Sequence, residues 1–169
     1  MTRSSAMIRR FVALGAVLAV VGAAGCKSAP KKEGEDIAPI NAINADIPTT
    51  GDSDSGKAMG MQTVHFPYDS FAIEGEAKTT LNGNAEVLKG NSTIRVQIEG
   101  HCDQRGGIQY NIALGEKRAN ALKKYLEGQG IASDRITTIS FGKERPIDPG
   151  TTEDAYGKNR RGNFVITSK

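Results

Sequence analysis

The chain has 169 residues with 22 basic and 19 acidic side chains and no tryptophan, and its formal charge at pH 7 is +3. The excess is confined to the N-terminus, where Arg3, Arg9 and Arg10 stand without any acidic residue, whereas residues 26–169 carry 19 side chains of each sign. Since binding to a phosphate backbone needs several Lys or Arg contacts on one face, this balance argues against nucleic acid as a partner.

The N-terminal segment has the pattern of a bacterial export signal. Its arginines are followed by an uncharged, mostly apolar run from Phe11 to Gly25, and Cys26 comes directly after this run. The sequence Ala-Ala-Gly-Cys at 23–26 resembles the lipobox of bacterial lipoproteins, which implies removal of residues 1–25 as a signal peptide and acylation of Cys26. The alternative is an uncleaved membrane anchor, but this run is shorter than the roughly 20 residues that a spanning helix needs.

A lipidated Cys26 would leave Cys102 as the single remaining cysteine. We therefore expect Cys102 to be a free or buried thiol rather than half of a disulfide. The chain has only two histidines, His65 and His101. Together with Cys102 they are too few for a four-ligand zinc site of the Cys/His kind, so the sequence implies no metal and no cofactor.

Residues 26–60 are expected to form the lipidated cysteine and a flexible tether. From Lys27 to about Gly60 the sequence is dominated by Lys, Ser, Pro, Gly, Asp and Asn, with isolated Ile residues and no helical or strand period. A coil of this length spans on the order of 30 Å and reaches ~110 Å when it is taut. Such a reach suits a domain that works at a distance from its membrane.

Residues 61–169 have the length and patterning of one small domain. Apolar residues recur at helical spacing from Ile73 to Leu88 and again from Leu114 to Leu126. Strand patterns cover four segments, namely 63–66, 93–99, 136–141 and 163–167, and a Gly/Pro-rich loop is expected after the third. The order β-α-β-α-β-β predicts a sheet covered by two helices, of the α+β class.

The polar loop between the second strand and the second helix is the best candidate for a binding site, because loops on a rigid scaffold often face ligands. The helix that follows it places Asn111, Leu114 and Arg118 on one face. Asp103 in the loop and Arg118 can hold the ammonium and the carboxylate of one zwitterion, through charge-assisted hydrogen bonds of ~1.5–3 kcal/mol each. The residues leave an alternative open, a solvated loop in which these two side chains form a surface salt bridge worth ~0–1 kcal/mol.

His101, Cys102 and Asp103 also contain the residue types of a base, a nucleophile and an orienting carboxylate. Adjacent side chains in extended backbone point to opposite sides, however, and working triads combine residues that are distant in the chain. A cysteine hydrolase is therefore disfavoured. His65, in the first predicted strand, is expected to be a packed or half-exposed strand residue rather than a ligand.

Three motifs carry a family resemblance. They are Gly-His-Cys-Asp-Gln-Arg-Gly at 100–106, Tyr-Asn-Ile-Ala-Leu-Gly-Glu-Lys-Arg-Ala-Asn-Ala at 110–121 and Asn-Arg-Arg at 159–161. Together with the first strand and its exit they resemble the peptidoglycan-associated lipoprotein (Pal) family, which carries an OmpA-like peptidoglycan-binding domain. The resemblance covers about residues 63–169. It implies an OmpA-like β-α-β-α-β-β sandwich with one mixed four-stranded sheet and two helices packed on it.

The resemblance also implies a ligand. The domain is expected to bind, without covalent chemistry, the meso-diaminopimelate of uncrosslinked stem peptides in peptidoglycan, with Asp103 taking the ammonium and Arg118 the carboxylate. Other contact positions of the family fall on Asp69, Asn111, Leu114 and Arg160. In this family a lysine after the lipidated cysteine, here Lys27, favours passage to the outer membrane, so the domain is expected to face the periplasm from a lipid anchor.

The expected role is that of an outer-membrane lipoprotein that tethers the membrane to the cell wall. It would be the Pal component of a Tol-Pal system supporting envelope integrity and cell division, with Tol proteins as further partners and no enzymatic activity. One alternative is another OmpA-like wall binder, such as a porin tail or a flagellar stator subunit. A second alternative is a periplasmic wall hydrolase, which would turn over muropeptides, whereas a binder would leave them unchanged.

Overall fold

The computed structural model describes residues 50–169. The predicted signal peptide, Cys26 with its predicted lipidation, Lys27 and most of the predicted tether lie outside the described residues. Among residues 50–169, none of the helices combines the length and the apolar character needed to cross a membrane.

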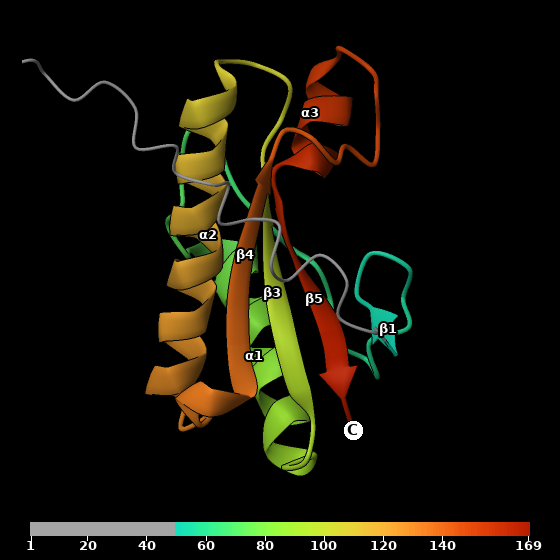
Figure 1. The fold of residues 1–169 in the computed structure, drawn as a ribbon, viewed down its shortest axis with the longest axis vertical. Coiled ribbons are helices and arrows are strands. Elements are labelled where there is room, and N and C mark those ends of the chain that lie inside the picture. The colour runs from blue at the N-terminus through green and yellow to red at the C-terminus, as the bar shows by residue number, and fades with distance from the viewer. Residues whose placement is uncertain (1–49) are drawn as a thin grey trace, which may run out of the picture. The chain divides into compact units, whose positions relative to one another are not determined.

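Along the described chain two short strands come first, and helices and longer strands follow in turn (Figure 1). The strands are β1 (Gly51–Asp52), β2 (Val64–His65), β3 (Arg95–His101), β4 (Ile136–Gly142) and β5 (Arg161–Ser168). The helices are α1 (Gly75–Gly90), α2 (Ile108–Gly128), α3 (Glu153–Asn159) and the short 3-10 helix η2 (Ser133–Arg135). The predicted α+β class is confirmed, and each predicted helix and strand is present at its place in the chain.

The strands form one mixed sheet with β3 in its interior. β4 runs parallel to β3 on one side, and β5 runs antiparallel to it on the other. The outer edge of β5 pairs with two short strands, β1 at residues 165–166 and β2 at residues 161–162. The sheet therefore has five strands instead of the four predicted, because residues ahead of the first predicted strand also pair with β5.

Helices α1 and α2 pack on one face of the sheet, because their apolar residues recur every three or four positions and so form one stripe on each helix. The core that they share with the sheet includes Leu81, Leu88, Leu122, Leu126, Ile98, Phe164 and Ile166. Each of these side chains has no exposed surface. Since full burial of such a side chain contributes roughly 1.5–3 kcal/mol, this layer holds α2 firmly against the sheet.

Two glycines bring α2 close to the end of β3. A Cβ on Gly100 would lie 2.6 Å from the carbonyl carbon of Gly115 and would overlap the carbonyl oxygen. A Cβ on Gly115 would overlap Ser140 Oγ. Only residues without a side chain fit here, so Gly100 and Gly115 place the first turns of α2 beside the carboxyl end of β3, where the polar loop begins.

The predicted tether is wrong at its C-terminal boundary. The backbone N–H groups of Thr50 and Ser53 each donate to a carbonyl oxygen of β5, over 2.9 Å. Ala58 is completely buried. The sequence of these residues has no strand period, but the edge of β5 offers unpaired backbone groups that need hydrogen-bond partners. The folded domain therefore includes residues 50–60, which the prediction assigned to the tether.

The Gly/Pro-rich segment after β4 contains a helix, α3, that the sequence pattern did not predict. Thr152 Oγ1 accepts a hydrogen bond from Ala155 N at its start, over 3.3 Å, and Asn159 at its end accepts from the amides of Ile147 and Asp148. Seven residues with a single buried apolar side chain are too few to show a helical period. Helix α3 lies at the end of the sheet where β4 ends and β5 begins (Figure 1).

Candidate functional site

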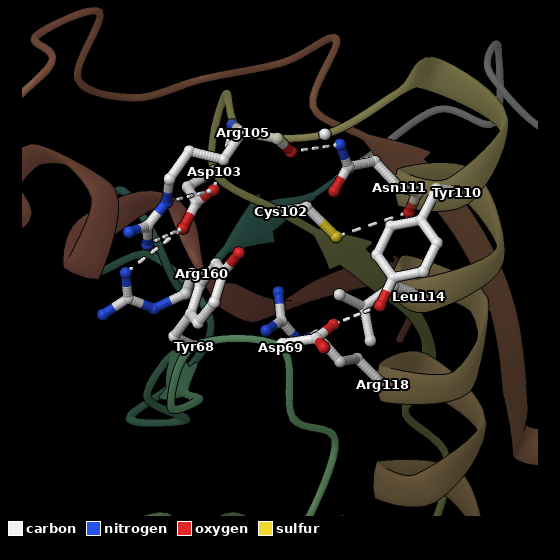
Figure 2. Close-up of a pocket in the computed structure, with 11 residues that line it drawn as sticks. Tyr68, Asp69, Cys102, Asp103, Arg105, Tyr110, Asn111, Leu114, Arg118 and Arg160 are labelled. Carbon is white, nitrogen blue, oxygen red and sulfur yellow. Dashed lines mark hydrogen bonds and ion pairs between the residues drawn. The ribbon is translucent and has the colours of Figure 1, made fainter.

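A pocket lies between the N-terminal half of α2, the loop after β2 and the loop after β3 (Figure 2). It has about 310 Å³ of empty space, including its open mouth. Its lining residues are Tyr68, Asp69, Cys102, Asp103, Arg105, Gly106, Tyr110, Asn111, Leu114, Arg118 and Arg160. All six side chains that the sequence marked as candidate contacts are among them, although they come from four separate segments of the chain.

Arg118 is a charged group without any exposed surface. Its Nε donates to Ser70 O over 2.8 Å, Nη1 to His101 O over 2.8 Å and Nη2 to Pro67 O over 3.1 Å. The described part of the chain offers it no carboxylate within salt-bridge distance. Burial lowers the pKa of Arg118, but a guanidinium stays protonated in proteins. The pocket therefore keeps a positive charge, which among residues 50–169 contacts carbonyl dipoles and, at 5.1 Å, the ring of Phe66.

Asp103 lies on the other side of the pocket (Figure 2) and is 4 % exposed. Its Oδ1 accepts from the backbone N of Arg105 over 3.1 Å and from Nε over 3.2 Å. Its Oδ2 accepts from Arg105 Nη2 over 2.6 Å and from Arg160 Nη1 over 3.2 Å. Burial acts to raise the pKa of Asp103, but these hydrogen bonds outweigh it and the pKa lies below its usual value. The carboxylate is thus ionised at neutral pH and already has four donors.

The two arginines at Asp103 are held differently. Arg105 lies between the rings of Tyr68 and Tyr156, with its guanidinium carbon 4.1 Å and 4.4 Å from the ring centroids. Both guanidinium groups also contact Glu153, over 3.3 Å for Arg105 and 2.8 Å for Arg160. The side chain of Arg105 is 33 % exposed and that of Arg160 is 10 % exposed. Arg105 is therefore the cation nearer to solvent.

The wall opposite these arginines combines polar and apolar groups. The backbone of Asp69 is left-handed, with φ +51°, and its carboxylate accepts a hydrogen bond from the hydroxyl of Tyr110, which raises the pKa of Tyr110. Asn111 Nδ2 donates to Arg105 O over 2.7 Å and so closes the loop after β3. Leu114 adds an apolar surface that is almost buried. The pocket can therefore accommodate a ligand with both charges and a short aliphatic part.

Cys102 and His101 have separate partners. Cys102 is a free, buried thiol as predicted; its Sγ donates to Asn111 O over 3.3 Å, and burial raises its pKa. His101 Nε2 lies 3.3 Å from Glu99 Oε2, and its ring stacks on Phe141 with centroids 5.6 Å apart. Within residues 50–169, therefore, the thiol has no base that would activate it as a nucleophile.

The structure brings Asp103 and Arg118 to one pocket, as the sequence predicted. The alternative, a surface salt bridge between these two side chains, is not formed. They do not pair with each other: Asp103 binds two arginines and Arg118 binds carbonyl groups. Arg105, Tyr68 and Tyr110 also line the pocket, although they were not among the predicted contacts. Arg105 and Tyr110 lie inside the motifs that carried the resemblance, so their charge and aromatic character were the available signal.

His65, expected to be a packed or half-exposed strand residue, is exposed in β2. Its Nδ1 lies 3.3 Å from Gly157 O, a contact between β2 and α3. It takes no part in the pocket, whose lining does not include it.

Residues 65–160 match the model of the OmpA family. The chain is 37% identical over 163 residues to the peptidoglycan-associated lipoprotein of Pseudomonas aeruginosa, which covers 90% of this chain and 93% of that protein. The chain is also 40% identical over 103 residues to the peptidoglycan-associated lipoprotein of Buchnera aphidicola. That match covers 61% of this chain and only 60% of the relative's length. The crystal structure of the peptidoglycan-associated lipoprotein from Burkholderia pseudomallei superposes with a TM-score of 0.61 at 32% identity, over 67% of this chain and 96% of that chain. The chain therefore belongs to the OmpA family and, within it, to the peptidoglycan-associated lipoproteins.

Proposed function

We propose that this protein is an envelope lipoprotein that binds peptidoglycan without covalent chemistry and tethers the outer membrane to the cell wall. Its ligand is the free zwitterionic end of meso-diaminopimelate in uncrosslinked stem peptides. The carboxylate of that end binds at Arg118 and the ammonium at Asp103, while Leu114 contacts the aliphatic part. Asp69, Asn111 and Arg160 form the rest of the binding surface.

One observation carries the proposal. Arg118 keeps its charge in a pocket where residues 50–169 offer it three carbonyl oxygens and the ring of Phe66, but no carboxylate within salt-bridge distance. Burying a cation without a counter-ion is costly, and a ligand that carries a carboxylate would complete the ion pair. A ligand carboxylate would form charge-assisted hydrogen bonds of about 1.5–3 kcal/mol there. The ionised Asp103 across the same pocket adds the opposite charge, so the site favours a zwitterion over a simple anion.

A single such site binds modestly, because two or three contacts must also offset the entropy of association. In the proposed arrangement the acyl chains on Cys26 hold the domain close to a wall that offers many identical stems. The high local concentration of stems then supplies the retention that one site lacks. The Lys27 sorting signal and a role in the Tol-Pal system, with Tol proteins as partners and a contribution to cell division, belong to the same proposal and rest on the family resemblance.

The test is co-sedimentation of the full-length chain, in detergent, with purified sacculi that contain meso-diaminopimelate. Wild type should pellet, whereas Arg118→Ala and Asp103→Asn should stay in solution, with folding checked by circular dichroism. Arg135→Ala is the matched control, because Arg135 also donates to three backbone carbonyls, of Leu88, Asn91 and Ile94, but lies next to the start of β4. If Arg118→Ala still pellets like wild type, the site is wrong.

The same sacculi distinguish a binder from a wall hydrolase. Chromatography of the supernatant after incubation should show no released muropeptide, because the thiol of Cys102 is buried and, within residues 50–169, hydrogen-bonds to the carbonyl oxygen of Asn111 rather than to a basic side chain. Release of muropeptides that grows with time and with protein concentration would replace binding by turnover as the function.

A further inference from the structure

The carboxylate proposed to receive the ligand's ammonium is already saturated by the protein's own cations. A carboxylate has about four lone-pair positions for donors. In Asp103 all four are used, three by Arg105 and one by Arg160. An ammonium group can reach Asp103 with full-strength hydrogen bonds only if one of these donors leaves.

Arg105 is the donor that can leave. Arg160 is anchored from both sides, because its Nε donates to Phe66 O over 3.1 Å and its Nη2 contacts Glu153 over 2.8 Å. The guanidinium of Arg105 is more exposed, and its Nε and Nη2 both donate to Asp103. If it swings away, it keeps Glu153 as a partner, at 3.3 Å in this structure. The exchange therefore leaves no charge of Arg105 unpaired.

We propose that Arg105 is an internal competitor of the ligand: its guanidinium occupies the ammonium position on Asp103 and is displaced when the stem peptide binds. Tyr68 and Tyr156, which enclose the guanidinium, stabilise this closed state through cation–π contacts. Apparent affinity then equals the intrinsic affinity reduced by the fraction of molecules in which Arg105 is released. This inference rests on the proposed function. It adds a mechanism by which the affinity of a single site stays low and binding stays reversible.

The competition makes Arg105 different from an ordinary binding residue, since its removal should strengthen binding. Titration calorimetry of the full-length chain in detergent, with a soluble disaccharide tetrapeptide that contains meso-diaminopimelate, measures this directly. We expect Arg105→Gln to bind at least threefold more tightly than wild type. Tyr156→Leu, which removes one ring from the guanidinium but does not line the pocket, should shift the affinity in the same direction by a smaller factor.

Two controls separate release of Asp103 from general effects. Arg95→Gln removes an equal charge from an exposed ion pair with Asp134 at the other end of β3 and should leave the affinity unchanged. A tetrapeptide whose free diaminopimelate amine is acetylated lacks the ammonium, so Arg105→Gln should give no gain with it. A gain that persists with the acetylated ligand would overturn the inference, because the gain would not come from the freed carboxylate.

The two proposals fail in different ways. If wild type binds the tetrapeptide and Asp103→Asn does not, but Arg105→Gln binds equally or more weakly, then the site stands and Arg105 is a ligand contact or a loop support rather than a competitor. If neither wild type nor Arg105→Gln binds the tetrapeptide, the proposed function itself is wrong, and the competition falls with it. Thermal melting of each variant shows whether a loss reflects unfolding.

Discussion

The close approach of α2 to β3 predicts that Gly100→Ala damages both the fold and the pocket. The added methyl group would lie 2.6 Å from the carbonyl carbon of Gly115 and would overlap its oxygen. That neighbour is backbone in the middle of α2, so it cannot move aside as a flexible side chain does. The helix must shift or tilt, and with it Arg118, less than one turn further along the same helix.

The magnitude follows from the cost of overpacking. Inserting a methyl group into a closely packed contact typically costs about 1–3 kcal/mol. For a domain of this size, 1 kcal/mol corresponds to roughly 4 °C in melting temperature, so Gly100→Ala should lower it by about 4–12 °C. Gly83→Ala is the matched control, because nothing lies within 4 Å of a Cβ at this exposed position inside α1. There the same substitution should stabilise by about 0.5–1 kcal/mol.

Thermal melting followed by circular dichroism, for both variants and wild type, tests this difference in sign. Binding to sacculi, measured on the same preparations below their melting temperatures, should weaken for Gly100→Ala and remain unchanged for Gly83→Ala. If Gly100→Ala melts at the wild-type temperature and binds normally, α2 is not held at this distance by the two glycines. The two glycines would then not determine the position of Arg118 in the pocket.

Two further predictions concern pH and the N-terminal edge. Burial lowers the pKa of His101 from 6.5 in spite of Glu99 beside it. The unfolded chain therefore takes up a proton at a higher pH than the folded one, and stability should fall as the pH drops below about 6.5. Urea unfolding at pH 7.5 and 5 should show a smaller loss of stability for His101→Gln than for wild type, and an equal loss would mean that other groups cause it. A chain that starts at residue 59 should be about 2–4 kcal/mol less stable than one that starts at residue 50. It loses the hydrogen bonds of β1, and it leaves buried Arg161 without the carboxylate of Asp54, which lies 2.8 Å from Arg161 Nε. Equal urea midpoints of the two chains would show that β1 contributes nothing to stability.

The fold could be predicted well because its main elements are encoded locally. The apolar stripes that end at Leu88 and Leu126 mark helices that bury one side, and alternation from Thr93 to Glu99 marks a strand with two unlike faces. The failures are elements without such a period. Residues 51–52 are a strand only because β5 offers an edge, and α3 is a helix of seven residues held by caps.

The candidate site divides in the same way. Sequence by itself determined that Asp103 lies close to Asn111, Leu114 and Arg118, because these three share one helical face and the polar loop with Asp103 leads into that helix. Only the tertiary structure decided what each charge binds. Arg118 takes carbonyls from a loop 48 residues away, and Asp103 takes Arg160 from 57 residues away. Burial and ion pairing depend on which distant segments exclude water from a group, and no local pattern records that.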